Sequence, residues 1–246
     1  MENIYESSRL LDEYLLFHYG SLDEALSDNG ISYPLSMKEA WGFPSRTARG
    51  FSKSKVDRGL DLGCSVGAST FAMAENCREV IGIDYSHSFI AAAERLRNGH
   101  QIPYQRIDEG HVTTLLHASL KLDFEIKNII FEQGDAHHLR EDLGTFDRVH
   151  AANLLCRLSN PNLLLERFPS LLRDGGELLI ATPCTWLENF TPSIHWPSGS
   201  TLDWLKSHLW KSFDLARTWD EPFLIRETAR KFQWSTSQVS LWRRKA

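Results

Sequence analysis

Residues 60–70 read Leu60-Asp61-Leu62-Gly63-Cys64-Ser65-Val66-Gly67-Ala68-Ser69-Thr70, and they decide the fold. They form the pattern of an apolar strand, a glycine turn and the start of a helix. Residues 80–84 then supply a second apolar strand that ends in Asp84. Glycines at such a turn let the backbone approach a ligand, and an acid at the end of the next strand can accept hydrogen bonds from ribose hydroxyls. The pattern therefore predicts an α/β sheet that holds an adenosine-containing cofactor.

The spacing of the glycines distinguishes between cofactors. A dinucleotide fingerprint that begins at Gly63 needs a glycine at position 65, where this chain has Ser65. The alternative pattern, acid-x-Gly-x-Gly-x-Gly, is matched by Asp61, Gly63 and Gly67, with Ser65 in place of the middle glycine. This arrangement resembles the S-adenosylmethionine site of Rossmann-like methyltransferases. It favours that function over a nicotinamide dehydrogenase or an α/β domain without a ligand.

Composition narrows the function classes further. The chain has 246 residues and a formal net charge of −5, which argues against a general nucleic-acid binder. Its four cysteines lack paired spacing, so we expect a reduced, cytoplasmic protein without a metal site. No apolar run is long enough to span a bilayer, and the first residues do not resemble a signal peptide. These features favour a small-molecule substrate, with no nucleic acid and no membrane as partners.

The rest of the chain predicts a doubly wound, mostly parallel Rossmann-like α/β sheet of about seven strands. We expect a single domain over residues 1–246. Its N-terminal helical arm covers residues 1–55, with helices over 8–19 and 21–28 and an irregular stretch over 30–55. The core covers residues 56–246, with an inserted β-hairpin near 100–123. The expected strands are 60–62, 80–84, 126–132, 147–151, 178–182, 213–219 and 237–242.

Ligands of such sheets bind at the carboxyl ends of the strands, where strand order reverses. That rule places one set of residues on a common rim: Gly63, Asp84, Asp135, Asn153 and Pro183. We expect Asp84 to bind the ribose. The methyltransferase resemblance implies that Asp135 accepts the adenine amino group and that the next backbone N–H meets the ring. The remaining cofactor candidates are neighbours of these positions: Cys64, Gly67, Tyr85 and Ala136.

Three further residues are candidates around the methionine part of the cofactor. Asp61 is expected to order the glycine loop through backbone N–H groups and to reach the methionine amine. Asn153 is expected beside the sulfonium. Arg46, in the arm, could pair with the cofactor carboxylate. Each has a structural alternative: a loop brace, a polar strand end and a surface arginine, respectively.

Five segments outside the glycine loop point to a narrower family. They are Tyr14–Gly20, Ala151–Leu158, Thr185–Glu188, Pro222–Glu227 and Arg230–Trp234. Together they resemble the methyltransferase domain of ovothiol biosynthesis, which methylates the imidazole π nitrogen of 5-thiohistidine. In many members this domain follows an iron-dependent sulfoxide synthase in one polypeptide. We expect this chain to be a stand-alone or cut-out methyltransferase that works with a separate synthase, on 5-thiohistidine or its seleno analogue.

The resemblance also suggests where the acceptor binds. Arginine suits a carboxylate because its guanidinium forms a fork of donors, so Arg157 and Arg226 are candidates for the α-carboxylate. Glu188 is a candidate for the α-ammonium group. Tyr14, Phe17, His18 and Trp186 could frame the ring, and Tyr14, His18 and Asn153 are the catalytic candidates. For each of these candidates the alternative is a structural role, either packing in the core or a charge at the surface.

Two other functions remain open from the sequence alone. One is methyl transfer to another small amine, phenol or thiol. The other is a non-catalytic subunit that binds S-adenosylmethionine and activates a partner. Assays across unrelated acceptors distinguish these alternatives.

Overall fold

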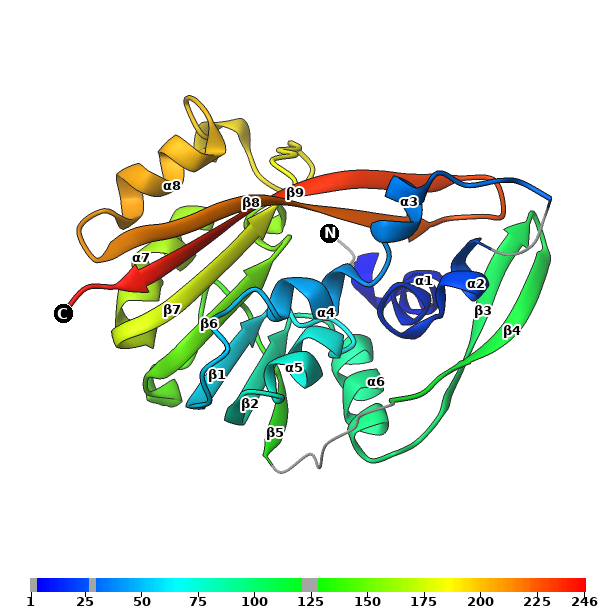
Figure 1. Ribbon diagram of the computed structural model, residues 1–246, viewed down its shortest axis with the longest axis horizontal. Coiled ribbons are helices and arrows are strands. Elements are labelled where there is room, and N and C mark those ends of the chain that lie inside the picture. The colour runs from blue at the N-terminus through cyan, green and yellow to red at the C-terminus, as the bar shows by residue number, and fades with distance from the viewer. Residues whose placement is uncertain (1–3, 27–29, 121–127) are drawn as a thin grey trace.

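A computed structural model describes residues 4–26, 30–120 and 128–246, and a seven-stranded sheet lies at its centre (Figure 1). The strand order is β5-β2-β1-β6-β7-β9-β8. All neighbouring pairs from β5 to β7 are parallel, whereas β9 is antiparallel to both of its neighbours. The mostly parallel, doubly wound sheet predicted from sequence is therefore confirmed. The strands are β1 (Val56–Leu62), β2 (Cys77–Asp84), β5 (Ile129–Gln133), β6 (Phe146–Ala152), β7 (Leu172–Thr182), β8 (Phe213–Arg226) and β9 (Phe232–Arg244).

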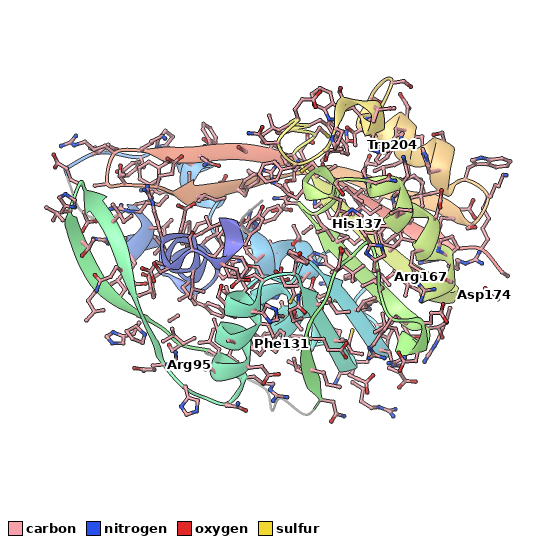
Figure 2. All side chains as sticks on the ribbon, turned by 180° about the vertical axis from the view of Figure 1, so that it is seen from behind. Arg95, Phe131, His137, Arg167, Asp174 and Trp204 are labelled. Atoms are coloured by element: carbon pink, nitrogen blue, oxygen red, sulfur yellow. The ribbon has the colours of Figure 1, made fainter. Side chains whose placement is uncertain are left out.

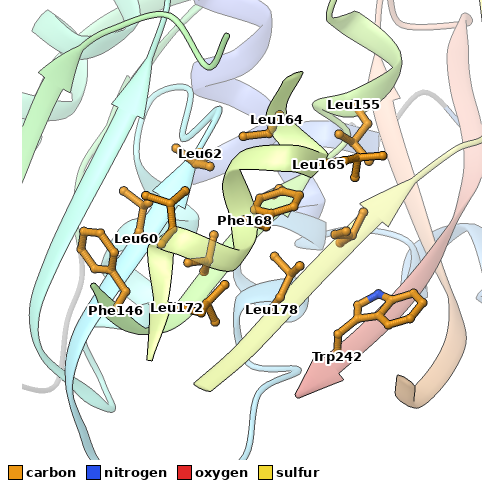
Figure 3. Close-up of a cluster of buried hydrophobic side chains, with 14 of the residues drawn as sticks. Leu60, Leu62, Phe146, Leu155, Leu164, Leu165, Phe168, Leu172, Leu178 and Trp242 are labelled. Atoms are coloured by element: carbon orange, nitrogen blue, oxygen red, sulfur yellow. The ribbon is translucent and has the colours of Figure 1, made fainter. Parts of the chain in front are cut away.

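Helices cover both faces of this sheet (Figure 1). One face carries α4 (Phe43–Ala48), α5 (Ala68–Met73) and α6 (His87–Arg97), and the other carries α7 (Pro161–Leu171) and α8 (Thr201–Leu209). Figure 3 shows the core between α7 and the sheet, where Phe168 of α7 packs among Leu60, Leu178 and neighbouring apolar side chains. Burying such large apolar groups supplies the main driving force for this layered arrangement. Short 3₁₀ turns are η1 (Ile4–Glu6), η2 (Glu141–Leu143), η3 (Leu155–Arg157) and η4 (Ser193–His195).

The N-terminal arm is more helical than its sequence suggests. Helices α1 (Ser8–Tyr19) and α2 (Leu22–Leu26) match the prediction, although residues 27 and 28 of the expected second helix lie outside the described residues. The stretch 30–55, expected to be irregular, contains α3 (Leu35–Glu39) as well as α4. That expectation was wrong because helices this short offer too few residues for a visible period.

The inserted hairpin is confirmed as β3 (Ile102–Glu109) paired with β4 (Val112–Ala118) in a separate two-stranded sheet. Positions 121–123 of the expected insertion, and the first two residues of the strand expected over 126–132, lie outside the described part. Six of the seven core strands are longer than expected, and the difference is greatest for β7, β8 and β9. β7 begins at Leu172 and passes through a break in register, while β8 and β9 extend well beyond the sheet (Figure 1).

The far end of the β8–β9 pair reaches the β3–β4 hairpin and encloses α1 and α2 (Figure 1). Arg226 at the end of β8 forms an ion pair of 2.6 Å with Asp108 of β3. The backbone N–H of Ala229 donates to the Asp108 carbonyl at 3.0 Å. Two segments far apart in sequence therefore hold the helical arm in place. Among the described residues, no helix has the length and apolarity needed to cross a membrane.

Candidate active site

The structure brings the predicted rim residues together. β2, β1 and β6 are parallel neighbours, so Asp84, Gly63 and Asn153 follow their strands at one edge of the sheet. A methyl group added at Gly63 would lie 3.1 Å from Leu154 Cδ1. The loop after β1 thus packs directly against the loop after β6, as a shared ligand site requires.

The glycine loop owes its shape to three left-handed residues. Gly63 has φ of +70° and Gly67 has φ of +96°, and a Cβ at Gly67 would lie 2.8 Å from Phe131 Cζ. Ser65, at the position where the pattern expects its middle glycine, has φ of +52°. A non-glycine residue in this region is unfavourable by about 1–3 kcal/mol. The loop therefore keeps the conformation of the glycine pattern despite the serine.

Cys64 can meet a cofactor only through its backbone. Its side chain is fully buried, and burial raises the pKa of the thiol well above its ordinary value. The N–H groups of Gly63 and Cys64 both donate to the Ile83 carbonyl, at 2.8 and 3.1 Å. These bonds fix the start of the loop against the end of β2.

Asp84 lies beside this loop in a position that fits a ribose. Its two carboxylate oxygens accept the N–H groups of Ser65 at 2.8 Å and Ser86 at 2.9 Å. Burial raises the pKa of Asp84 to about 6, although these hydrogen bonds lower it. Each oxygen keeps a second lone pair for a hydroxyl donor. The next residue, Tyr85, has an exposed ring.

Asp61 has a different role from the one predicted. It is 1% exposed, and its oxygens accept from Ser69 Oγ at 2.6 Å and Thr70 Oγ1 at 2.7 Å and lie 2.8 Å from His150 Nδ1. Burial disfavours its charge, but these three partners outweigh burial and lower the pKa of Asp61. The prediction that backbone N–H groups bind Asp61 was therefore wrong, whereas its contact with the methionine amine stays a prediction. Asp61 stabilises the loop through hydrogen bonds with buried side chains.

This buried network also connects to the arm, and the sequence did not predict it. His150 of β6 also places Nε2 3.2 Å from Thr47 Oγ1 of α4. Thr47 and His150 are both almost completely buried. The hydroxyl pair directly after the glycine loop is a local signal for a buried acid, whereas nothing local points to His150.

Asp135 contacts two imidazoles that were not predicted to belong to the site, and Figure 2 labels one of them, His137. Its carboxylate lies 2.8 Å from His137 Nδ1 and 3.0 Å from His138 Nδ1. Burial disfavours its charge, but these contacts and the His137 N–H lower the pKa of Asp135. His137 Nε2 accepts the Asn160 N–H at 3.2 Å, so Nδ1 carries the proton donated to Asp135. Ala136 is half-buried beside them.

The end of α1 lies against the glycine loop. Tyr19 donates its hydroxyl to the Val66 carbonyl at 2.5 Å. One turn earlier, the Tyr14 ring stacks on His18 with centroids 6.0 Å apart. His18 Nδ1 is buried and has no hydrogen-bond partner among the described residues. Burial, opposed by Asp61, lowers the pKa of His18 to about 3, so the imidazole is neutral.

Phe17, predicted to frame the acceptor ring, is instead a core residue. It is 7% exposed and packs in the apolar cluster with Phe43 and Trp41. Its ring centroid lies 6.3 Å from that of Phe43 in a stacked arrangement. That prediction was wrong because the arm folds back on itself and covers this face of α1.

Arg157 follows β6 and has no carboxylate within ion-pair distance in the described ranges. Its guanidinium lies 4.5 Å from the centre of the Phe190 ring. Tyr5 of η1 is close enough to feel this charge: burial raises the pKa of Tyr5, and the charge of Arg157 partly opposes the rise. Ser86 Oγ donates to the Tyr5 carbonyl at 3.1 Å and fixes this turn beside Asp84. Tyr5 was not among the residues predicted for the site.

Two predicted arginine roles were wrong. Arg46, assigned to the cofactor carboxylate, pairs with Glu221 at 2.7 Å and also donates to backbone carbonyls of Trp41 and Pro222. Arg226, assigned to the acceptor, is 3% exposed and binds Asp108 and the Ala25 carbonyl. Both guanidinium groups join distant segments of the fold.

The loop after β7 carries the remaining candidates. Trp186 donates Nε1–H to Thr201 Oγ1 at 3.1 Å and packs edge-on to Trp204 of α8, which Figure 2 labels. Glu188 is exposed. Their assignment to the acceptor stays a prediction. Within the ranges the structure describes, no three His, Cys, Asp or Glu side chains are grouped to hold a metal ion.

Comparison with known proteins agrees with this site. A family model described as a methyltransferase domain matches residues 53–228, more than half of the chain. Phosphoethanolamine N-methyltransferase 3 of Arabidopsis thaliana is 30% identical over 127 residues, which cover 51% of this chain and 21% of that protein. An uncharacterized methyltransferase of Schizosaccharomyces pombe is 25% identical over 159 residues, which cover 63% of this chain and 50% of that protein. The matches thus span about a fifth of the Arabidopsis protein and half of the Schizosaccharomyces protein.

Solved structures share the fold at low sequence identity. The N-methyltransferase NodS of Bradyrhizobium japonicum, in complex with S-adenosylhomocysteine, has a TM-score of 0.56 at 15% identity, with 94% of this chain and 100% of NodS covered. A Haloferax volcanii methyltransferase in complex with the activator Trm112 has a TM-score of 0.57 at 15% identity, with 84% of this chain and 91% of that chain covered. Together with the glycine loop and Asp84, the family match shows that the chain belongs to the methyltransferase domain family, with S-adenosylmethionine as its methyl donor.

Proposed function

We propose that the chain methylates the imidazole π nitrogen of 5-thiohistidine, or of its seleno analogue, as in ovothiol biosynthesis. The observation that carries the proposal is Arg157, a half-buried cation at the carboxyl end of β6 with no carboxylate partner among the described residues. Partial burial removes some of the water around this guanidinium, so a ligand anion there would gain a favourable charge pair. An amino-acid acceptor supplies one through its α-carboxylate. The ovothiol-type segments of the sequence support the same assignment.

The cofactor side of the site is formed by the residues at the ends of β1, β2 and β5. The backbone of the glycine loop, with Gly63, Cys64 and Gly67, would cradle the methionine part. Asp84 would accept the ribose hydroxyls, with Tyr85 beside it, and Asp135 and Ala136 would meet the adenine. When bound, S-adenosylmethionine supplies a sulfonium methyl group and leaves as S-adenosylhomocysteine.

The acceptor side combines fixed charges with a neutral acceptor atom. Arg157 would bind the α-carboxylate and Glu188 the α-ammonium group. Because His18 stays neutral and its buried Nδ1 has no described partner, it can accept the N–H of the acceptor ring. That bond would leave the other ring nitrogen with its lone pair available. Tyr14, which stacks on His18, and Trp186 would flank the ring.

Holding the acceptor in this way is the main catalytic task that we assign to the chain. A nitrogen lone pair needs no strong base, so rate enhancement comes from orientation, which can contribute about 7–11 kcal/mol. Selectivity is harder because a thiolate is a better nucleophile than an imidazole nitrogen. The site therefore needs donors that hold the sulfur away from the methyl group.

We also propose a functional pairing with a separate iron-dependent sulfoxide synthase that supplies the acceptor. Two alternatives have observations in their favour. Relatives named as N-methyltransferases favour nitrogen acceptors in general, so another small amine is one alternative. A structural neighbour solved with an activator favours a subunit that works with a protein partner.

The test is product analysis after incubation with S-adenosylmethionine and 5-thiohistidine. Mass and NMR assignment should show one methyl group on the π nitrogen, and histidine should react much more slowly. Turnover only on an unrelated amine, phenol or thiol would replace the acceptor. Binding of S-adenosylhomocysteine without turnover across the acceptor panel would favour the partner-subunit alternative.

A further inference from the structure

Asn153 is held in an unusual conformation where β6 ends. Its φ is +54°, in the left-handed region, which asparagine tolerates better than most residues. Its backbone N–H donates to the Ala181 carbonyl of β7 at 2.8 Å. The backbone of Asn153 is therefore set by the neighbouring strand and directs the chain away from the sheet.

The side chain of Asn153 is fixed by a second strand. Ser237 of β9 is fully buried, and its Oγ–H donates to Asn153 Oδ1 at 2.7 Å. This bond places Oδ1 of the amide against Ser237 and leaves the NH₂ group on the other side. In the part of the chain that the structure describes, the NH₂ group of Asn153 has no hydrogen-bond partner. The pair therefore leaves one oriented donor for a ligand.

This donor lies where an acceptor has to approach. Asn153 precedes Leu154, which packs on Gly63 of the glycine loop. On its other side, Ser237 adjoins Gln238, the residue that pairs with Thr182 at the end of β7. Asn153 is thus located between the cofactor loop and the loop after β7.

We propose that Ser237 is a positioning residue that presents the NH₂ group of Asn153 to the thiolate of the acceptor and so determines which atom is methylated. This inference rests on the proposed function. A hydrogen bond to an ionised acceptor is roughly twice as strong as a neutral one, and it lowers the nucleophilicity of the thiolate while fixing the position of the sulfur. The sulfur is held at Asn153, and the ring nitrogen faces the methyl group.

The two competing products differ only in the atom that forms the new bond. In each, a lone pair of the acceptor bonds to the methyl carbon, and the electron pair of the broken carbon–sulfur bond stays on the sulfur of the donor. Methylation at nitrogen leaves a ring proton that passes to solvent, whereas methylation at sulfur consumes the thiolate charge. The ratio of the two products therefore reports directly on how the acceptor is held.

The experiment compares wild type with S237A, using S-adenosylmethionine and 5-thiohistidine. We expect S237A to lower the ratio of N-methyl to S-methyl product at least tenfold and to raise the KM for the acceptor. The affinity for S-adenosylhomocysteine, measured by calorimetry, should stay within twofold. N153A should shift the ratio equally, and the double variant should shift it no further because both changes remove one interaction.

Ser240 provides the matched control. It lies on the same strand, is 1% exposed, and accepts the Trp242 Nε1–H at 2.9 Å, so S240A removes an equally buried hydroxyl outside the site. S240A should keep the wild-type product ratio. S237C, with a weaker donor of similar size, should give an intermediate ratio and replaces S237A if that variant does not fold.

Two results would overturn the inference. One is an S237A or S237C enzyme with the wild-type product ratio; the other is an S240A enzyme with the same shift as S237A. Wild-type protein that binds S-adenosylhomocysteine but methylates neither atom of 5-thiohistidine would overturn the proposed function as well. The two failures are therefore distinguishable.

Discussion

Asp84 Oδ2 accepts the backbone N–H of Ser65 at 2.8 Å, so the acid that ends β2 also closes the glycine loop that follows β1. Ser65 has a left-handed backbone, and this bond helps to offset its conformational cost. The same carboxylate is the candidate ribose ligand. Its protonation state therefore links the shape of the loop to the affinity for the cofactor.

The first prediction concerns the pH dependence of that affinity. Burial raises the pKa of Asp84 to about 6 from an ordinary value of 3.8. Because the folded protein binds this proton more tightly, Asp84 favours the ligand-free fold most below pH 4, and this contribution is lost as the pH rises through about 6. The charged form binds ribose hydroxyls better. Calorimetry should therefore show that affinity for S-adenosylhomocysteine falls between pH 7.5 and pH 5.

D84N is the variant that isolates this effect. It should bind S-adenosylhomocysteine about tenfold or more weakly at pH 7.5, since charge-assisted hydrogen bonds contribute roughly 1.5–3 kcal/mol. Its affinity should also depend less on pH. Asp57 lies at the start of β1, at the end of the strand away from the glycine loop, so D57N serves as the control and should keep the wild-type pH profile. A wild-type affinity that stays constant across this range would contradict the assignment of Asp84.

The second prediction concerns the buried brace at Asp61. D61N replaces a carboxylate that accepts from Ser69, Thr70 and His150, and it should lower the free energy of unfolding by about 3 kcal/mol. The pKa of Asp61 is lowered, so its stabilising effect is present above about pH 4 and is lost as the pH falls through the folded-state pKa. Urea unfolding at pH 7 and pH 3 measures both effects.

The control for D61N is D57N, which changes an exposed acid on the same strand. Asp57 pairs with Arg78 at the surface, and D57N should change the free energy of unfolding by less than about 1 kcal/mol. Equal losses in D57N and D61N would show that the buried network contributes nothing specific. The expected difference between the two variants should narrow at pH 3.

The third prediction concerns the ion pair between Arg226 and Asp108. The Arg226 side chain is completely buried, and D108N would leave it and Arg106 without their shared carboxylate. Breaking a buried pair in this way costs about 3–5 kcal/mol. Amide hydrogen exchange should accelerate in α1 and α2, which this contact encloses. K231A, which breaks the exposed pair with Glu227, should leave that exchange unchanged.

Local features of the chain could be predicted from sequence. The glycine loop, the acid that ends β2 and the β3–β4 hairpin each depend on a few neighbouring residues. The N-cap of α6 is also a local feature, since Ser86 Oγ accepts the Phe89 N–H at 3.1 Å. The alternation of apolar strands and helices was enough to predict a doubly wound, mostly parallel sheet.

Long-range partners could not be predicted in the same way. Asp61 and His150 are 89 positions apart, and Arg46 lies 175 positions from Glu221. The charge of each residue was visible, but the identity of its partner depends on how β6 and β8 pack against the arm. For that reason Arg46 and Arg226 were predicted to bind ligands, whereas in the folded chain both join distant segments.

The fourth prediction concerns Arg157, whose guanidinium faces an aromatic ring and has no acid partner among the residues that the structure describes. Arg157 lies over Phe190, and a ligand carboxylate there would gain a charge-assisted, forked hydrogen bond. R157A should therefore raise the KM for 5-thiohistidine about 10–100-fold, equivalent to roughly 1.4–2.8 kcal/mol. R157K should recover part of this loss because lysine keeps the charge but not the fork. An acceptor analogue that lacks the carboxylate should react equally well with wild type and R157A. If R157A weakens both acceptors alike, Arg157 supports the fold of the loop and does not bind the carboxylate.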